Sequence, residues 1–194
     1  MLDNLKKYNI ILASNSPRRR ELLTGLGLDY EVKLIKGIDE SYPPHLKGDE
    51  IPIFISRIKA ASYRPVMAEN DLVITADTIV YADGEVLGKP KDRDDAVRML
   101  KILSGHTHQV MTGVSITTRD FQRSFASVSD VTFDNLTDEE IYFYIDNYKP
   151  YDKAGAYGIQ EWIGFIGVSG IRGSYFNVMG LPVQRLYKEL CSIE

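Results

Sequence analysis

Three arginines follow a serine–proline pair near the start of this 194-residue chain, in the segment Ala13-Ser14-Asn15-Ser16-Pro17-Arg18-Arg19-Arg20. Ser16 and Pro17 are typical of the N-cap and first position of a helix, which places the arginines in its first turn. Cations at that end oppose the helix dipole by roughly a few tenths of a kcal/mol each. Backbone N–H groups, the hydroxyls of Ser14 and Ser16 and the guanidinium groups of Arg18 and Arg19 suit a bound triphosphate. A solvated basic helix end, with Ser16 as a simple cap, explains the same residues equally well.

A carboxylate follows an apolar run in Ile74-Thr75-Ala76-Asp77-Thr78. We expect the strand at 72–76 to end before Asp77, at the edge where α/β proteins place reactive groups. There Asp77 is suited to take a proton from water or to hold a divalent metal ion. A turn aspartate that caps residue 78 or 79 is the commoner structure for this pattern taken alone.

Two lysines and a glutamate add further candidates. Lys89 lies in Gly88-Lys89-Pro90, where the proline stiffens a turn that can present an ammonium group to phosphate. Lys59, on a predicted helix, has the same potential, and Glu40 in the polar loop 37–50 is a candidate metal ligand. Each of the three, considered alone, is more simply an exposed charged side chain.

A glycine-rich segment, 152–160, ends at Gln160. Small residues allow a ligand to approach the backbone, and a glutamine amide offers the donor and the acceptor that a pyrimidine edge requires. A tightly packed turn is the commoner explanation. His106 and His108 have the alternate spacing of some metal sites, but no third ligand is evident nearby, and we interpret them as structural.

Hydrophobic periodicity and capping residues indicate which elements hold these groups. Strands are expected at 9–13, 30–36, 72–76, 109–118 and 124–133, with a hairpin over 79–87 that turns at Asp83-Gly84. Helices are expected at 18–26, 51–67, 92–103, 137–148 and 181–190, and a strand-and-turn region at 152–180. Strands that alternate with helices predict an α/β protein, and the long central hairpin predicts a mixed sheet.

Composition excludes several classes of protein. The net charge of −4 argues against general nucleic-acid binding. The sequence also lacks the stripe of basic and aromatic residues that is typical of an RNA-binding module. Residues 1–20 nevertheless carry five basic side chains and one acidic one, which favours a small anionic ligand. No apolar stretch approaches the length of a transmembrane helix, no secretory signal is evident, and the single cysteine fits a reducing compartment, so we expect a cytoplasmic protein without membrane association.

In order along the chain, the motifs resemble those of the Maf family of nucleoside triphosphate pyrophosphatases. The matching segments are 14–19, 76–78, 88–90, 104–108, 152–160 and 173–182. The resemblance implies one Maf-type domain over 1–194, with a compact two-lobed α/β fold related to the inosine triphosphate pyrophosphatase type and a cleft between the lobes. It also implies a nucleoside triphosphate substrate, a divalent cation (Mg²⁺ or Mn²⁺) and often a homodimer.

The resemblance also assigns roles to individual residues. Asp77 would be the general base, and Arg18, Arg19, Lys59 and Lys89 would hold phosphates. We further expect Asp77 and Glu40 to hold the divalent cation. Arg18, Thr78 and Gln160 match the branch that prefers dTTP and UTP over 7-methylguanosine triphosphate. Glu161-Trp162 departs from the glycine expected after Gln160. The alternative activity is that of a nucleotide-binding regulator of cell division or septum formation with little turnover.

Overall fold

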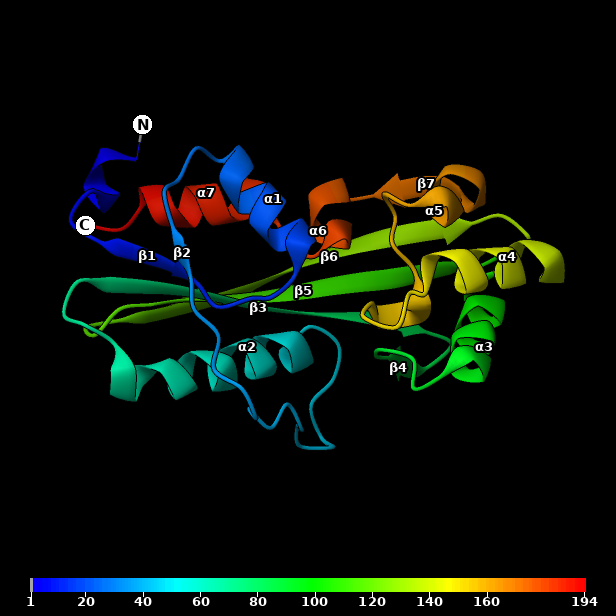
Figure 1. Cartoon of the computed structure of the whole chain (residues 1–194), viewed down its shortest axis with the longest axis horizontal. Coiled ribbons are helices and arrows are strands. Elements are labelled where there is room, and N and C mark those ends of the chain that lie inside the picture. The colour runs from blue at the N-terminus through cyan, green and yellow to red at the C-terminus, as the bar shows by residue number, and fades with distance from the viewer. Residues whose placement is uncertain (1) are drawn as a thin grey trace. The chain divides into compact units, whose positions relative to one another are not determined.

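The computed structural model describes residues 2–194 and contains a seven-stranded mixed sheet (Figure 1). The strand order is β2-β1-β3-β5-β6-β7, with β4 paired to β3. Strand β1 pairs in parallel with β2 and β3, whereas β4 is antiparallel to β3 and β7 is antiparallel to β6. The prediction of an α/β protein with a mixed sheet is therefore confirmed.

The strands are β1 (Asn9–Leu12), β2 (Glu31–Val32), β3 (Asp71–Ala82), β4 (Glu85–Leu87), β5 (Thr107–Thr117), β6 (Gln122–Phe133) and β7 (Val168–Arg172). The α-helices are α1 (Pro17–Gly25), α2 (Glu50–Tyr63), α3 (Arg93–Leu103), α4 (Asp138–Tyr148), α5 (Trp162–Gly167), α6 (Tyr175–Met179) and α7 (Val183–Cys191). Short 3-10 helices are η1 (Asp3–Leu5), η2 (Arg64–Val66) and η3 (Ala154–Ala156). No helix within residues 2–194 is long and apolar enough to cross a membrane.

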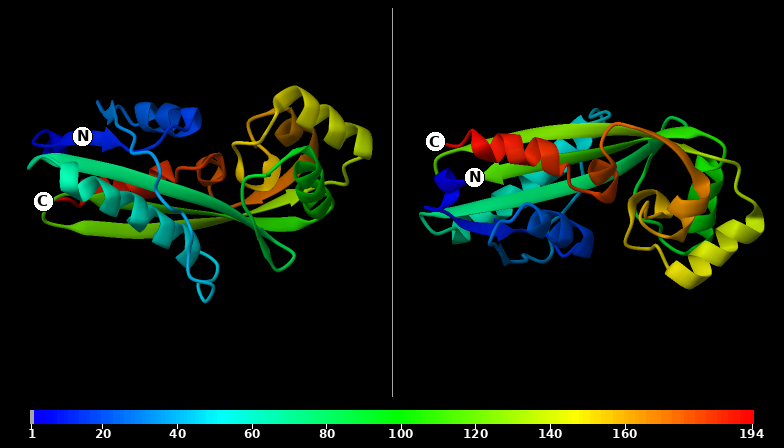
Figure 2. Two further views of the ribbon diagram at one scale, coloured as in Figure 1. Left: turned by 60° about the horizontal axis from the view of Figure 1, so that its bottom comes forward. Right: turned by 90° about the horizontal axis from the view of Figure 1, so that it is seen from above.

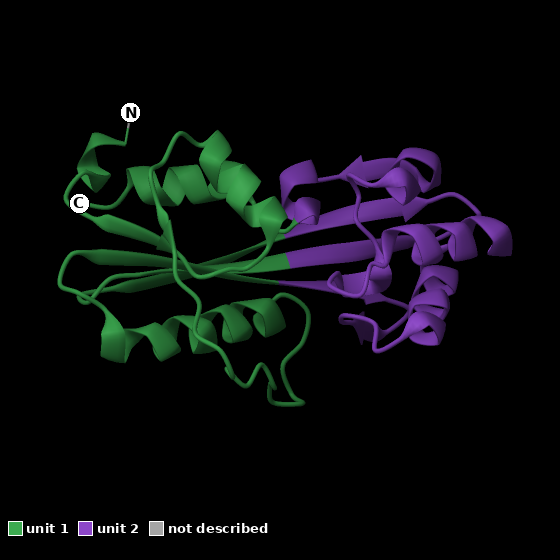
Figure 3. Cartoon of the chain, in the orientation of Figure 1, with its two compact units in different colours: residues 1–77, 112–127, 180–194 green, residues 78–111, 128–179 purple. Residues whose placement is uncertain are grey.

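The chain forms two compact units (Figure 3). Unit 1 comprises residues 1–77, 112–127 and 180–194, and unit 2 comprises residues 78–111 and 128–179. Strands β3, β5 and β6 contribute residues to both units. The predicted single domain with a cleft between two lobes stays a prediction.

Unit 1 is a layered structure in which α2 covers one face of the sheet and α1 and α7 cover the other (Figures 1 and 2). Helix α2 buries Ile51, Ile55, Ala60 and Tyr63 at helical spacing. Strand β5 lies very close to this helix, because a Cβ added at Gly113 would lie 2.3 Å from the carbonyl carbon of Pro52. Because Gly113 has no side chain, the backbone of α2 can contact the backbone of β5 at this position.

Unit 2 contains an aromatic core around a buried histidine. The rings of His108, Phe133 and Tyr157 pack edge to face, with centroids 5.0 to 5.4 Å apart. Nε2 of His108 lies 2.7 Å from the Tyr157 hydroxyl, and burial lowers the pKa of His108 to about 4. The described residues contain no group of three His, Cys, Asp or Glu side chains placed to hold a metal ion. His108 is a packing residue, as the sequence indicates.

The structure corrects three of the predicted elements. Asp77 does not follow a strand but lies inside β3, because the apolar run resumes at Ile79 and the strand continues to Ala82. The strand expected at 30–36 is only Glu31–Val32, which pairs with Ile11 and Leu12, the last two residues of β1. The region 152–180 contains α5 and α6 as well as β7. Helices α5 and α6 have only six and five residues, which is too short for a helical period to be visible in the sequence.

Candidate active site

The N-terminus of α1 forms the first part of the candidate site. Ser16 caps the helix by accepting a hydrogen bond from the backbone N–H of Arg19, at 3.4 Å. The buried Ser14 hydroxyl accepts from the backbone N–H of Ser16 at 3.2 Å. Both serines therefore organise the turn that precedes the helix, and Arg18 stands half-buried in its first turn. The predicted cap is confirmed.

Arg19 connects three separate segments of unit 1. Its Nε donates to the carbonyl oxygen of Gly180 at 2.8 Å, and its Nη1 donates to the carbonyl oxygen of Ala76 at 2.9 Å. Burial lowers the pKa of the Arg19 guanidinium, and the negative charges of Asp77 and Glu40 oppose that effect. Arg19 thus fixes the backbone immediately before Asp77 and adds a positive charge close to it.

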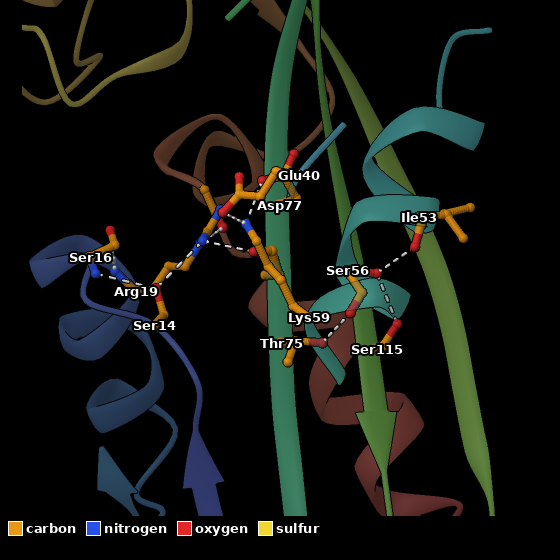
Figure 4. A network of polar contacts seen from close by, with 12 residues as sticks. Ser14, Ser16, Arg19, Glu40, Ile53, Ser56, Lys59, Thr75, Asp77 and Ser115 are labelled. Atoms are coloured by element: carbon orange, nitrogen blue, oxygen red, sulfur yellow. Dashed lines mark hydrogen bonds and ion pairs between the residues drawn. The ribbon is translucent and has the colours of Figure 1, made fainter. Parts of the chain in front are cut away.

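Lys59, Asp77 and Glu40 form the centre of the site (Figure 4). Nζ of Lys59 lies 2.8 Å from Oδ1 of Asp77 and 3.2 Å from Oε1 of Glu40. The side chains of Lys59 and Asp77 are each only 14% exposed, whereas Glu40 lies in an open loop and is 48% exposed. The fold therefore brings together a helix, a strand and a loop that are distant in sequence, with two carboxylates around one cation.

The group of charges around Lys59 can both accept a proton and bind an anion. Partial burial strengthens the interaction between the ammonium and carboxylate groups relative to that of an exposed pair. The Asp77 carboxylate, which lies beside Lys59 and Arg19, is placed to accept a proton from a bound water, and the cations beside it can bind an anion. The unit 1 candidates (Ser14, Ser16, Arg18, Arg19, Glu40, Lys59 and Asp77) all belong to this region or to the helix end beside it.

The remaining candidates, Thr78, Lys89 and Gln160, belong to unit 2. Thr78 is half-buried in β3, and Lys89 is exposed in the turn after β4. The backbone N–H of Gly155 donates to the carbonyl oxygen of Gly88 at 3.0 Å, which joins the lysine turn to the glycine-rich segment. Gly155 has a φ of +69°, and any Cβ there would lie 2.9 Å from Val80. A glycine is required at this contact.

Gln160 presents an acceptor without a partner. Its Oε1 atom is buried and makes no hydrogen bond within the described residues. An unsatisfied buried acceptor costs roughly 1–3 kcal/mol, which a ligand donor would recover. Trp162, which departs from the expected pattern, packs against Phe143 with ring centroids 4.8 Å apart. The indole is therefore part of the contact between α4 and α5.

Neighbours of Gln160 fix its segment through a buried ion pair. Nζ of Lys153 lies 3.1 Å from Oε1 of Glu161, and the Tyr144 hydroxyl donates to Oε2 of the same carboxylate. The Tyr144 hydroxyl also accepts from the backbone N–H of Gly158 at 3.0 Å. Lys153 is only 7% exposed, so the pair is protected from solvent. This polar framework gives the segment around Gln160 a defined conformation.

Sequence reasoning missed several residues that support the site. The Glu161, Tyr144 and Lys153 group was not expected, and neither was the role of the Gly180 carbonyl. Two buried hydroxyl residues, Thr75 and Ser56, also went unnoticed. Their signal in the sequence is a polar residue within an apolar run or on the apolar face of a helix, where a hydrogen-bond partner is required.

The chain matches known proteins over nearly its whole length. A family model described as "Maf-like protein" matches residues 9–193. A relative from Phocaeicola vulgatus, named "dTTP/UTP pyrophosphatase", is 67% identical over 190 residues, covering 98% of each chain. A relative from Bacteroides thetaiotaomicron with the same name is 62% identical over 190 residues, again covering 98% of each. The relative from Flavobacterium johnsoniae, also so named, is 49% identical over 191 residues, with 98% of each covered.

A solved structure titled "Structure of a HAM1 protein from Coxiella burnetii" aligns with 96% of this chain and 100% of that one. The TM-score is 0.49 at 15% sequence identity. The fold class rests on the sheet and helices described above.

Proposed function

The chain belongs to the Maf-like protein family, and from that premise we propose that it hydrolyses dTTP and UTP to the monophosphate and pyrophosphate. The relatives that share 49 to 67% of its residues carry the name of this activity. The observation that carries the proposal is the contact of Lys59 with both Asp77 and Glu40, because it joins a candidate base to a cation in a partly buried position.

The triphosphate is held by the cationic region of unit 1. The N-terminus of α1, with Ser14, Ser16 and the guanidinium of Arg18, offers N–H and O–H donors to phosphate oxygens. Lys59 supplies an ammonium charge beside Asp77, and Arg19 adds its charge while it fixes the strand. In unit 2, Lys89 is an exposed ammonium group suited to a further phosphate contact.

Asp77 acts as the general base. Its carboxylate takes a proton from a water molecule, whose oxygen attacks the α-phosphorus. The bond between the α-phosphorus and the bridging oxygen breaks, and pyrophosphate leaves with the electron pair of that bond. Fixed cations stabilise the charge that spreads over the phosphate oxygens, which is the largest contribution expected in phosphoryl transfer.

Glu40 and Asp77 fit a divalent cation such as Mg²⁺ or Mn²⁺. Both carboxylates already lie within 3.2 Å of the same positively charged atom, Nζ of Lys59. Mg²⁺ is commonly bound by one or two carboxylates together with substrate phosphates and water. When bound, such an ion neutralises phosphate oxygens and orients the triphosphate.

Thr78 and Gln160 read the base. The buried Oε1 of Gln160 is an acceptor without a partner among residues 2–194. Uracil and thymine both present an N–H donor at ring position 3, whereas cytosine presents an acceptor there. The glutamine acceptor therefore favours the dTTP and UTP bases over dCTP. The proposal includes a cytoplasmic homodimer that binds neither nucleic acid nor membranes.

The test is product analysis. Purified protein is incubated with Mg²⁺ or Mn²⁺ and a panel of common and methylated nucleoside triphosphates, and the products are separated by chromatography. We expect monophosphate and pyrophosphate from dTTP and UTP, and we expect Asp77→Asn to bind nucleotide while it loses most turnover. Tight nucleotide binding without pyrophosphate release from the wild-type protein would instead indicate the regulator of cell division.

A further inference from the structure

A second polar link lies directly beside the contact between Lys59 and Asp77 (Figure 4). Oγ1 of Thr75 donates to the main-chain carbonyl oxygen of Ser56 at 2.7 Å. Side chains two residues apart on a strand share a face, so Thr75 and Asp77 point the same way from β3. Residues three apart on a helix are neighbours, so Lys59 lies one turn along α2 from Ser56. The two links therefore connect the same face of α2 to the same face of β3.

The Ser56 side chain extends this link across the sheet. Its Oγ donates to the carbonyl oxygen of Ile53 at 2.8 Å and lies 2.8 Å from Oγ of Ser115 on β5. Ser115 in turn lies 2.8 Å from Oγ of Ser124 on β6, which accepts from Nε of Arg57 at 3.1 Å. The helix is thus held to three strands by hydroxyl groups.

The direction of these hydrogen bonds follows from counting donors. A serine hydroxyl has one hydrogen, and that of Ser56 is given to Ile53. With that hydrogen given to Ile53, Ser115 donates to Ser56 and Ser124 donates to Ser115. Arg57 supplies the donor that Ser124 accepts. In this arrangement the hydroxyls of Ser56, Ser115 and Ser124 each donate one hydrogen bond and accept one, and the bonds reinforce one another.

These groups are buried where apolar residues would suffice for packing. Ser56, Thr75 and Ser115 are each 0% exposed. Hydrophobic contacts are not directional, so apolar side chains on α2 define its position along the sheet less sharply than a hydrogen bond does. A hydrogen bond from one hydroxyl to one carbonyl has a narrow range of distance and angle, so it selects a single register.

We propose that Thr75 is a positioning residue of the active site. Its hydroxyl fixes the register of α2 on β3 and thereby holds Nζ of Lys59 against the Asp77 carboxylate. The inference rests on the proposed function for its kinetic consequence, but the placement of Lys59 is measurable without any substrate. A displacement of about 1 Å in a reacting group can lower turnover by roughly 10²-fold.

The experiment compares three variants. Thr75→Val keeps the shape of the side chain and removes the donor, while Thr75→Ser restores the donor. Thr117→Val is the matched control, because Thr117 is also a buried strand threonine of unit 1, and its hydroxyl accepts a hydrogen bond from the Gln122 side chain. Denaturant unfolding of all three separates a general loss of stability from a loss of position.

The first readout is the ¹⁵N resonance of the Lys59 ammonium group in the free protein, assigned by its disappearance in Lys59→Met. We expect this resonance to shift and broaden in Thr75→Val and to stay in place in Thr75→Ser and Thr117→Val. An unchanged Lys59 resonance in Thr75→Val overturns the proposal, whether or not the protein turns over nucleotides.

The second readout is the kinetics with dTTP. We expect Thr75→Val to lower kcat by about 10-fold or more with a smaller change in KM, and Thr75→Ser to recover most of the loss. Because Thr75 acts through Lys59, the double variant with Lys59→Met should be no slower than Lys59→Met alone. Additive losses, or equal kcat values for Thr75→Val and Thr117→Val, would show that Thr75 contributes only to stability. A wild-type protein that releases no pyrophosphate refutes the proposed function and leaves the resonance test intact.

Discussion

Nζ of Lys59 lies 2.8 Å from Oδ1 of Asp77, and both side chains are 14% exposed, although one comes from the middle of a helix and the other from the middle of a strand. Glu40 approaches the same ammonium group from a loop, at 3.2 Å. A cation in this position neutralises the carboxylates in the free protein and is available to a phosphate when substrate arrives. The contact makes Lys59 a better candidate for a direct role than any exposed lysine.

Replacement of Lys59 by methionine tests that role. Lys59→Met keeps the length of the side chain and removes the charge, so we expect kcat/KM for dTTP to fall roughly 10²–10³-fold. Pyrophosphate release measures the effect. The control is Lys101→Met, which removes a cation from an exposed pair with Asp138 at 2.9 Å and should leave turnover unchanged. Equal activity of the two variants would remove Lys59 from the mechanism.

Local signals in the sequence were sufficient for much of the fold. Ser16 and Pro17 begin α1, and Thr137 with Glu140 forms the capping box of α4, because both patterns depend only on residues three or four positions apart. Asp83 and Gly84 adopt positive φ at the predicted hairpin turn between β3 and β4. The sequence also nominated Asp77 and Lys59 separately.

The contact between Asp77 and Lys59 could not be predicted from local sequence patterns. Asp77 was expected after a strand, but β3 continues past it, and the pairing with Lys59 depends on the register of α2 against the sheet. That register is set by Thr75, Ser56 and the close approach at Gly113, which are long-range contacts without a periodic signal. Exposed Glu40 reaches the site from a loop, whose path no periodicity predicts.

Replacement of Gln160 tests how the base is selected. The buried Oε1 of Gln160 has no partner within residues 2–194, so Gln160→Leu removes an acceptor that only a ligand would satisfy. We expect the preference for dTTP over dCTP, expressed as a ratio of kcat/KM values, to fall by about 10–100-fold. Gln109→Leu, which removes an amide that donates to Asp130 at 3.2 Å, is the matched control. If the ratio is the same in both variants, another residue selects the base.

Replacement of Gly113 tests how closely α2 packs on the sheet. A methyl group there would lie 2.3 Å from the Pro52 carbonyl carbon and 2.4 Å from the Ile53 nitrogen, both of them backbone atoms. Gly113→Ala should therefore lower the free energy of unfolding by about 1–3 kcal/mol, measured by denaturant titration. At Gly25, in α1, a Cβ meets nothing within 4 Å, so Gly25→Ala should be neutral or stabilising by up to about 1 kcal/mol. Equal stability of the two variants would mean that α2 moves away from β5 at little cost.

His108 predicts how the stability of the fold depends on pH. Burial lowers the pKa of this histidine from 6.5 to about 4, because the charged imidazolium is poorly solvated between Phe133 and Tyr157. Between these two pH values the unfolded chain binds more protons than the folded one, so the free energy of unfolding falls as the pH falls. The loss begins near pH 6.5 and reaches about 3 kcal/mol at pH 4 and below, while above pH 6.5 this histidine adds no pH dependence.

The His108 contribution is isolated by comparison with His108→Gln, which cannot titrate. Carboxylates whose pKa is lowered in the fold, such as Asp130 beside Arg172, also contribute less to the free energy of unfolding as they are protonated in acid. The wild-type protein and the variant share these carboxylates, so their effect cancels in the comparison. The difference between the wild-type and variant unfolding free energies should therefore decrease from pH 7 to pH 4, even if His108→Gln is less stable at every pH. A difference that is constant over this range would show that the imidazole becomes protonated in the folded protein without cost, so that the aromatic core around it opens to water.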